Sequence, residues 1–223
     1  MTSERPSDYQ VAAAYDAVAT EYAETLRDEL SGKPLDRALL GALVEMSHDS
    51  RIADIGCGPG HVTRYLASLG AKPIGIDISP AMIEIARAEN PDLEFKVETM
   101  TDLTEPDQSL SAAVLLYSII NLSKTERERT FAQIFRTLRT GGIALVSFHI
   151  RSEEFSAGQV QHLDTWFGHS VDINGHFLEP DQVIDEIAEA GFDIVSVTTR
   201  MPHPEVEIPT ERAYVLAQRP APD

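Results

Sequence analysis

Three glycines at alternate positions mark the part of the chain best suited to chemistry. Gly56, Gly58 and Gly60 directly follow an apolar run that contains one acid, Asp54. Glycine allows a backbone to turn tightly and to approach a ligand closely, and a helix that begins there presents free amide groups. A second acid, Asp77, ends the next apolar run. A carboxylate in that place accepts hydrogen bonds from both hydroxyls of a ribose.

Three kinds of cofactor compete for a glycine-rich turn of this type. A dinucleotide fold needs G-x-G-x-x-G, but the third position here is His61 and the glycine comes one residue earlier, at Gly60. A phosphate-binding loop needs Gly-Lys-Ser/Thr, which the sequence lacks. S-adenosylmethionine (SAM) has no phosphates and needs close backbone approach plus polar contacts. The turn together with Asp77 therefore favours SAM.

The chain resembles the class I SAM-dependent methyltransferases of the small-molecule type. Residues 54–60 (Asp-Ile-Gly-Cys-Gly-Pro-Gly) match that family's first motif, and residues 75–79 (Gly-Ile-Asp-Ile-Ser) match the next. Residues 136–142 are similar to the stretch before the family's fifth strand, and the resemblance extends over roughly residues 10–218. It implies an enzyme that moves the methyl group of SAM to an oxygen or nitrogen of a small organic acceptor, with S-adenosylhomocysteine (SAH) as product.

The resemblance also implies which residues contact the cofactor. They are Tyr15, Tyr22, Asp54, Gly56, Cys57, Gly58, Gly60, Asp77, Ile78, Met82, Thr99, Met100 and Tyr117. Thr99 stands where the family commonly has an acid, so adenine recognition is assigned to Thr99 and Met100, with Asp102 as the alternative. Tyr15 and Tyr22 would fold over the cofactor and exclude water, or would be simple core contacts.

Candidate catalytic residues follow the expected fourth and fifth strands, where open α/β sheets bind ligands. Tyr117 and Asn121 follow the fourth strand, and His149 follows the fifth. Methyl transfer is an in-line displacement at an activated carbon, so alignment supplies much of the rate. A base is needed only for an acceptor with a high pKa. Asn121 cannot act as a base, which leaves His149 as the candidate, or as a hydrogen-bonded wall residue.

The segment 151–179 is dense in aromatic and imidazole rings. Trp166, Phe167, His169 and His176 are its candidate acceptor-pocket residues, and simple packing within a hairpin is the alternative. The spacing of its histidines matches no standard ligand set, so no metal is expected.

The order of apolar runs predicts a single domain with a Rossmann-like, doubly wound, seven-stranded sheet, mostly parallel with an antiparallel last strand. A helical cap is expected at 8–47, a SAM-binding core at 51–150, an inserted hairpin lid at 151–179, and a helix with two edge strands at 180–218. The first helix is expected over 8–30. Gly141 and Gly142 are expected to stop a helix over 124–139, and the strands 192–200 and 211–218 to form an antiparallel edge.

Composition limits the partners. The 223-residue chain has a formal charge of −18, which disfavours nucleic acids and anionic membranes. The single cysteine, Cys57, excludes an internal disulfide, and no apolar run approaches a membrane span, so we expect a cytoplasmic monomer or homodimer with a small-molecule acceptor. A protein methyltransferase, a non-catalytic SAM-binding protein and an NAD(P)-dependent oxidoreductase are the rival functions.

Overall fold

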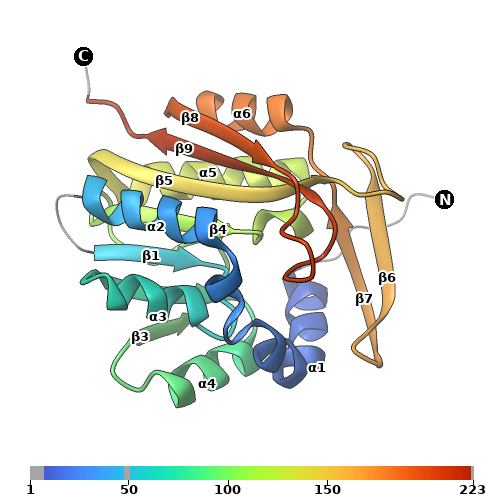
Figure 1. Ribbon diagram of the computed structural model, residues 1–223. Coiled ribbons are helices and arrows are strands. Elements are labelled where there is room, and N and C mark those ends of the chain that lie inside the picture. The colour runs from blue at the N-terminus through green and yellow to red at the C-terminus, as the bar shows by residue number, and fades with distance from the viewer. Residues whose placement is uncertain (1–7, 48–50, 222–223) are drawn as a thin grey trace.

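The computed structural model describes residues 8–47 and 51–221, and a seven-stranded sheet runs through it (Figure 1). The strand order is β3-β2-β1-β4-β5-β9-β8. The bounds are β1 Arg51–Ile55, β2 Lys72–Asp77, β3 Glu94–Val97, β4 Leu110–Leu116, β5 Leu138–Arg151, β8 Asp193–Arg200 and β9 Glu211–Gln218. Strands β1 to β5 pair in parallel, whereas β9 is antiparallel to both of its neighbours. The predicted Rossmann-like sheet with an antiparallel last strand is confirmed.

Helices cover both faces of this sheet, as apolar strands require. They are α1 Asp8–Leu26, α2 Pro34–Met46, α3 His61–Ser68, α4 Pro80–Glu89, α5 Lys124–Thr137 and α6 Pro180–Glu189, with the short 3₁₀ helices η1 Glu29–Gly32 and η2 Ile119–Asn121. Successive strand residues alternate between two cores: Ile52 packs with α2 and α3, whereas Ala53 belongs to the cluster of α5 and α6. No helix in the described ranges is long and apolar enough to span a bilayer.

Two sequence expectations about boundaries are wrong. The first helix ends at Leu26, and η1 follows it before Pro34 opens α2. The pair Gly141-Gly142 does not stop α5, because Leu138 is already extended, is fully buried and pairs with Leu110 of β4; both glycines lie within β5. The pairing of β5 with β4 therefore overrides the local glycine pattern at Gly141 and Gly142. Strands β8 and β9 pair antiparallel at one end of the sheet, as expected, with β8 outermost and β9 next to β5.

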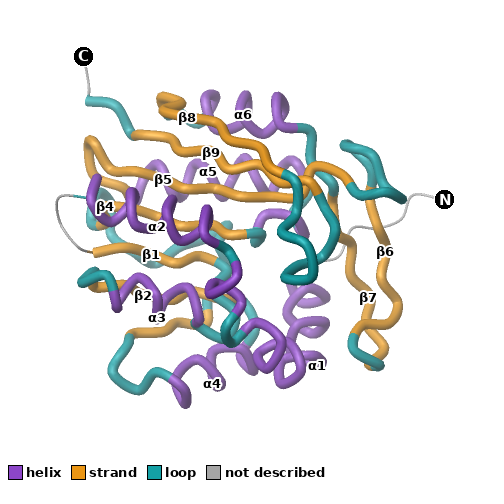
Figure 2. Tube along the Cα trace, viewed as in Figure 1, coloured by secondary structure: helices purple, strands orange, loops and turns teal. Residues whose placement is uncertain are grey.

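The cap and the lid lie together at one end of the sheet. The lid is a separate two-stranded sheet of β6 (Val160–Trp166) and β7 (His169–His176), as Figure 2 shows beside α1. Ala14 and Val18 of α1 form one buried cluster with Val171 and Ile173 of β7. Helix α1 and the inserted hairpin therefore form one packed unit over the carboxyl ends of the strands, whereas α2 packs on the face of the sheet.

Candidate functional site

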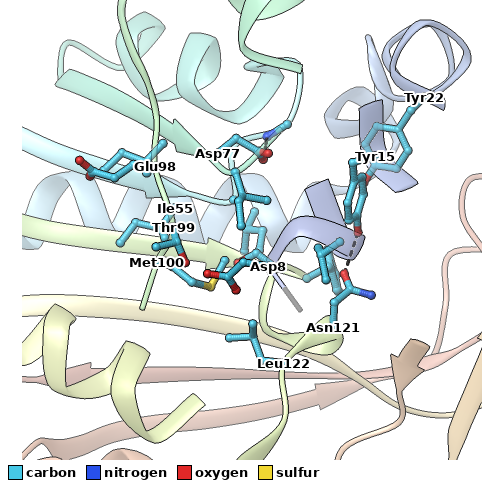
Figure 3. Close-up of a pocket in the computed structure, with 18 residues that line it drawn as sticks. Asp8, Tyr15, Tyr22, Ile55, Asp77, Glu98, Thr99, Met100, Asn121 and Leu122 are labelled. Atoms are coloured by element: carbon cyan, nitrogen blue, oxygen red, sulfur yellow. Dashed lines mark hydrogen bonds between the residues drawn. The ribbon is translucent and has the colours of Figure 1, made fainter. Parts of the chain in front are cut away.

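An open cavity lies where the carboxyl ends of β1 to β4 meet α1 and η2 (Figure 3). Ten of its lining residues are among those expected from the sequence: Tyr15, Tyr22, Gly56, Gly58, Asp77, Ile78, Thr99, Met100, Tyr117 and Asn121. The residues that sequence reasoning missed are Asp8, Val11, Ile55, Ile76, Glu98, Leu116, Ser118 and Leu122. The structure thus brings residues from five distant segments to one space.

Glycine is required in the turn because of the backbone conformation and because neighbouring side chains leave no room for a Cβ atom. Gly56 has φ +75°, and a Cβ there would lie 2.2 Å from the Cβ of Ser118. Gly60 has φ +83°, and a Cβ there would lie 2.9 Å from the ring of Phe95. A side chain at position 56 or 60 would clash with these neighbours. The backbone of the turn lines the cavity at Gly56 and Gly58.

Asp77 is held rigidly at the end of β2. Its Oδ2 accepts the Gly58 N–H at 2.8 Å, and its Oδ1 accepts the Ser79 N–H at 2.9 Å. Burial raises the pKa of this carboxyl above its ordinary value, against the lowering effect of those two bonds. Each oxygen keeps a lone pair, so the carboxylate can still accept a ligand's hydroxyl groups.

Four expected cofactor residues do not line the cavity. Asp54 is buried beneath the turn, where its Oδ2 accepts the Thr63 hydroxyl at 2.6 Å, and burial raises its pKa to about 6. Cys57 packs in a small apolar cluster with Phe95, and Met82 is fully buried in α4. Gly60 is the N-cap of α3.

Two buried polar atoms on the cavity lining have no hydrogen-bond partner among the described residues. They are Oε2 of Glu98 and Oγ of Ser118. Buried polar atoms are nearly always paired, so both atoms indicate a polar ligand. Glu98 directly precedes Thr99 at the end of β3, and the family's acid near that strand end would have pointed to it. Asp102, the alternative, does not line the cavity.

The lining carries acids without bases. Asp8, Asp77 and Glu98 line the cavity, and no described lining residue is lysine, arginine or histidine. The space is therefore suited to a cationic or hydrogen-bond-donating ligand and disfavours phosphates.

A ring cluster covers the cavity from α1. Tyr15, Tyr22 and Trp166 make three edge-on contacts, with centroids 5.3 to 5.8 Å apart. The Tyr15 hydroxyl donates to Asn121 Oδ1 at 2.9 Å, and Asn121 Nδ2 donates to the carbonyl of Asn174 in β7 at 2.8 Å. Burial and the charge of Asp77 raise the pKa of Tyr15, so its phenol remains protonated.

The four candidate acceptor-pocket residues lie outside the cavity lining. Trp166 packs against Tyr15 and Tyr22, the two tyrosines that cover the cavity. Phe167 is 43% exposed at the hairpin turn, and His169 approaches Glu21 of α1 at 3.1 Å. His176 ends β7. This part of the hairpin thus forms the outer wall of the cap.

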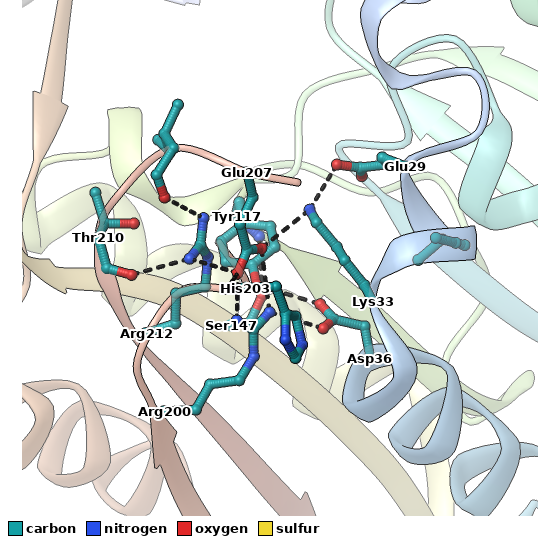
Figure 4. A network of polar contacts seen from close by, with 12 residues as sticks. Glu29, Lys33, Asp36, Tyr117, Ser147, Arg200, His203, Glu207, Thr210 and Arg212 are labelled. Atoms are coloured by element: carbon teal, nitrogen blue, oxygen red, sulfur yellow. Dashed lines mark hydrogen bonds and ion pairs between the residues drawn. The ribbon is translucent and has the colours of Figure 1, made fainter. Parts of the chain in front are cut away.

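Tyr117 connects the cavity to a buried polar network (Figure 4). Its backbone has φ +57°, a conformation that is rare for a bulky residue and persists only where the surroundings enforce it. The Tyr117 hydroxyl bonds Tyr214 at 2.6 Å and Asp36 at 3.2 Å. The cations Lys33 and Arg212 lie over its ring at 5.3 and 5.5 Å. These contacts fix the strained residue at the cavity wall.

His149 lies behind Tyr117 and does not line the cavity. The two rings stack with centroids 4.9 Å apart, and His149 Nδ1 bonds the Thr210 hydroxyl at 2.8 Å. Burial, then the charges of Arg212 and Lys33, lower the pKa of His149 to about 3. The imidazole is therefore neutral at physiological pH and separated from the cavity by a ring.

Comparison with known proteins agrees with this geometry. Residues 52–142 match the family model of a methyltransferase domain. Over residues 52–142 the chain belongs to the methyltransferase-domain family. A carboxy-S-adenosyl-L-methionine synthase of Yersinia enterocolitica is 31% identical over 135 residues, which is 55% of this chain and 50% of the relative. The chain thus spans about half the length of the curated relatives it matches.

Solved structures show the same fold over nearly the whole chain. A 1,6-didemethyltoxoflavin-N1-methyltransferase of Burkholderia thailandensis, 16% identical, superposes with a TM-score of 0.71 over 99% of this chain and 94% of its own. The [4+2]-cyclase SpnF, 18% identical, gives a TM-score of 0.74 over 98% of both chains. At these identities the likeness shows the fold alone.

Proposed function

We propose that the protein binds SAM in the cavity and transfers its methyl group to an oxygen or nitrogen of a small organic acceptor. The acidic lining supports this proposal most directly. SAM carries a sulfonium and an ammonium against one carboxylate, whereas a nicotinamide dinucleotide carries a pyrophosphate that Asp8, Asp77 and Glu98 would repel. The same lining argues against the oxidoreductase alternative.

The residues present are suited to the cofactor. Asp77 would accept the ribose hydroxyls, the open backbone at Gly56 and Gly58 would lie along the amino-acid part, and Glu98 with Thr99 would receive the adenine. SAM supplies a methyl carbon that its sulfonium already activates. Tyr15 and Tyr22 would shield that centre from water, so the protein's main contribution is alignment and desolvation.

The acceptor is proposed to reach the cavity beside Tyr117 and Asn121, next to the hairpin. Asn121 and the Tyr15 oxygen offer polar contacts there, and Trp166 of the hairpin packs against Tyr15. His149 is buried and neutral, so an acceptor that needs a base would lose its proton to water or to a cavity carboxylate. SpnF, which has this fold, is a [4+2]-cyclase. An activity assay must therefore show by mass spectrometry that the product has gained a methyl group.

Substitution of Asp77 tests the cofactor assignment. We expect Asp77→Ala to raise the dissociation constant of SAM at least tenfold, about 1.4 kcal/mol, because two hydroxyl contacts are lost. Isothermal titration calorimetry measures the affinity, and circular dichroism checks the fold. Asp92→Ala, which removes an exposed acid after α4, is the control. Unchanged SAM affinity in Asp77→Ala would overturn the assignment.

A further inference from the structure

Asp16 of α1 contacts the beginning of α4. Its Oδ1 accepts the Ser79 hydroxyl at 2.5 Å and the backbone N–H of Ala81 at 3.0 Å. Helix α4 has no acid in its own first turn. Asp16 therefore supplies, from another helix, the negative charge that stabilises a helix N-terminus.

Ser79 links this contact to Asp77. The Ser79 N–H donates to Asp77 Oδ1 at 2.9 Å, and its hydroxyl oxygen accepts the Met82 N–H at 3.1 Å. Ser79 is fully buried, and each of its two polar hydrogens has a carboxylate partner, Asp16 or Asp77. One rigid residue thus sets both the attachment of α1 and the orientation of Asp77.

The neighbours of Asp16 in the sequence show what this attachment controls. Tyr15 precedes it directly and lines the cavity, and Tyr22 lines the cavity from the same helix. Asp16 itself does not line the cavity. Its contacts with α4 therefore act on a ligand through the helix that carries the two tyrosines and through Ser79, which orients Asp77.

We propose that Asp16 is a positioning residue that docks the α1 cap over the cavity and couples closure of the cap to the binding of ligand at Asp77. The proposal rests on the proposed function, because the ligand it concerns is SAM or SAH. With Asp16 bonded to Ser79 and Ala81, Tyr15 and Tyr22 cover the cavity. Without those bonds the cap separates more often, and the ligand leaves sooner.

The chain contains its own reporter of cap position. Trp166 is its single tryptophan, and its ring lies 5.3 Å from Tyr15 and 5.4 Å from Tyr22. Release of α1 from α4 would also loosen its packing on the hairpin and expose one face of the indole to water. The tryptophan emission of the ligand-free protein then shifts to longer wavelength, so docking is measurable without any cofactor.

The test compares Asp16→Ala, Asp16→Asn and Glu24→Ala, which removes an exposed acid of the same helix. Calorimetry gives the SAH affinity, and stopped-flow tryptophan fluorescence gives the dissociation rate. We expect Asp16→Ala to weaken SAH binding about tenfold, mainly through faster dissociation, and to shift the ligand-free emission. Asp16→Asn keeps an accepting oxygen and should recover most of the affinity, whereas Glu24→Ala should match the wild type. A merely structural residue would lower the melting temperature and leave the dissociation rate and emission of the folded protein unchanged.

Ser79→Ala provides an independent check, including the case in which Asp16→Ala does not fold. It removes the hydroxyl but keeps the N–H that orients Asp77, so SAH binding should weaken about as much as in Asp16→Ala. The variant that carries both substitutions should lose no more SAH affinity than either single variant. Three outcomes would overturn the docking role. They are losses of SAH affinity that add up in the double variant, a loss in Glu24→Ala equal to that in Asp16→Ala, and unchanged SAH binding and emission in Asp16→Ala. A wild-type protein that binds neither SAM nor SAH overturns the proposed function instead, and the ligand-free emission then still decides whether Asp16 docks the cap.

Discussion

Asp54 illustrates how a single buried carboxyl under the glycine turn makes stability depend on pH. Its pKa is raised from 3.8 to about 6, chiefly by burial, and the Thr63 hydroxyl opposes this only in part. The folded protein therefore holds this proton more tightly than the unfolded chain. Between about pH 4 and pH 6 the contribution of Asp54 to stability falls as pH rises, and above pH 6 the full penalty, up to about 3 kcal/mol, is present.

Asp54→Asn should remove this penalty in the cofactor-free protein. An asparagine still accepts the Thr63 hydroxyl but never ionises, so we expect a melting temperature several degrees higher than wild type at pH 8. The difference should shrink as pH falls toward 4, because both proteins then carry a neutral group there. Thermal unfolding at a series of pH values measures it. A difference in melting temperature between Asp54→Asn and the wild type that stays constant with pH would show that Asp54 does not ionise in the folded state.

At the scale of elements, Asn121 of η2 is the joint between the cap and the hairpin. Its amide oxygen pairs the Tyr15 hydroxyl, and its amide nitrogen pairs the Asn174 carbonyl. Asn121→Ala would leave a buried hydroxyl unpaired, which costs about 1–3 kcal/mol. We expect a lower melting temperature and faster amide hydrogen exchange in both α1 and β7.

Asn174→Ala is the matched control for that joint. The backbone carbonyl that Asn121 uses remains, and only a partly exposed contact of the Asn174 side chain with His162 is lost. Its exchange rates in α1 should equal those of the wild type. If Asn121→Ala leaves α1 protected while β7 exchanges faster, the cap and the hairpin open independently.

The sequence predicts elements well where the information is local. The buried strands, the glycine turn and the Ser79 cap of α4 are each encoded within a few neighbouring residues, and the structure has all three. The buried network around Tyr117 was not predicted, because Asp36 meets Arg200 only after a separation of 164 positions. Local glycines likewise wrongly predicted a helix stop at 141–142, since pairing of Leu138 with Leu110 decides that boundary.

The same distinction applies to the site. Ten lining residues follow from motifs and from strand ends, whereas Ser118 and Asp8 reach the cavity only because η2 and α1 fold back over it. His149 ends the expected strand but lies behind Tyr117, and its position depends on the packing of β9 and Arg212. No local spacing encodes such packing.

The whole molecule carries a net negative charge, and the lining of the cavity has the same sign. The chain carries a formal charge of −18. The two cations over the ring of Tyr117, Lys33 and Arg212, are paired with Glu29 at 2.5 Å and Glu207 at 2.9 Å. They therefore do not offset the three carboxylates of the lining.

This field predicts different salt dependences for two nearly identical ligands. SAM carries a net positive charge, whereas SAH, which lacks the sulfonium, is net neutral. Attraction to the acidic cavity should accelerate SAM association at low salt, and screening should slow it by about threefold between 20 and 300 mM NaCl. SAH association should change little, and stopped-flow tryptophan fluorescence measures both rates. Asp8→Asn removes one carboxylate of the lining and should flatten the salt dependence for SAM alone. Equal salt slopes for the two ligands would mean that the acidic lining does not recognise the charge of the sulfonium.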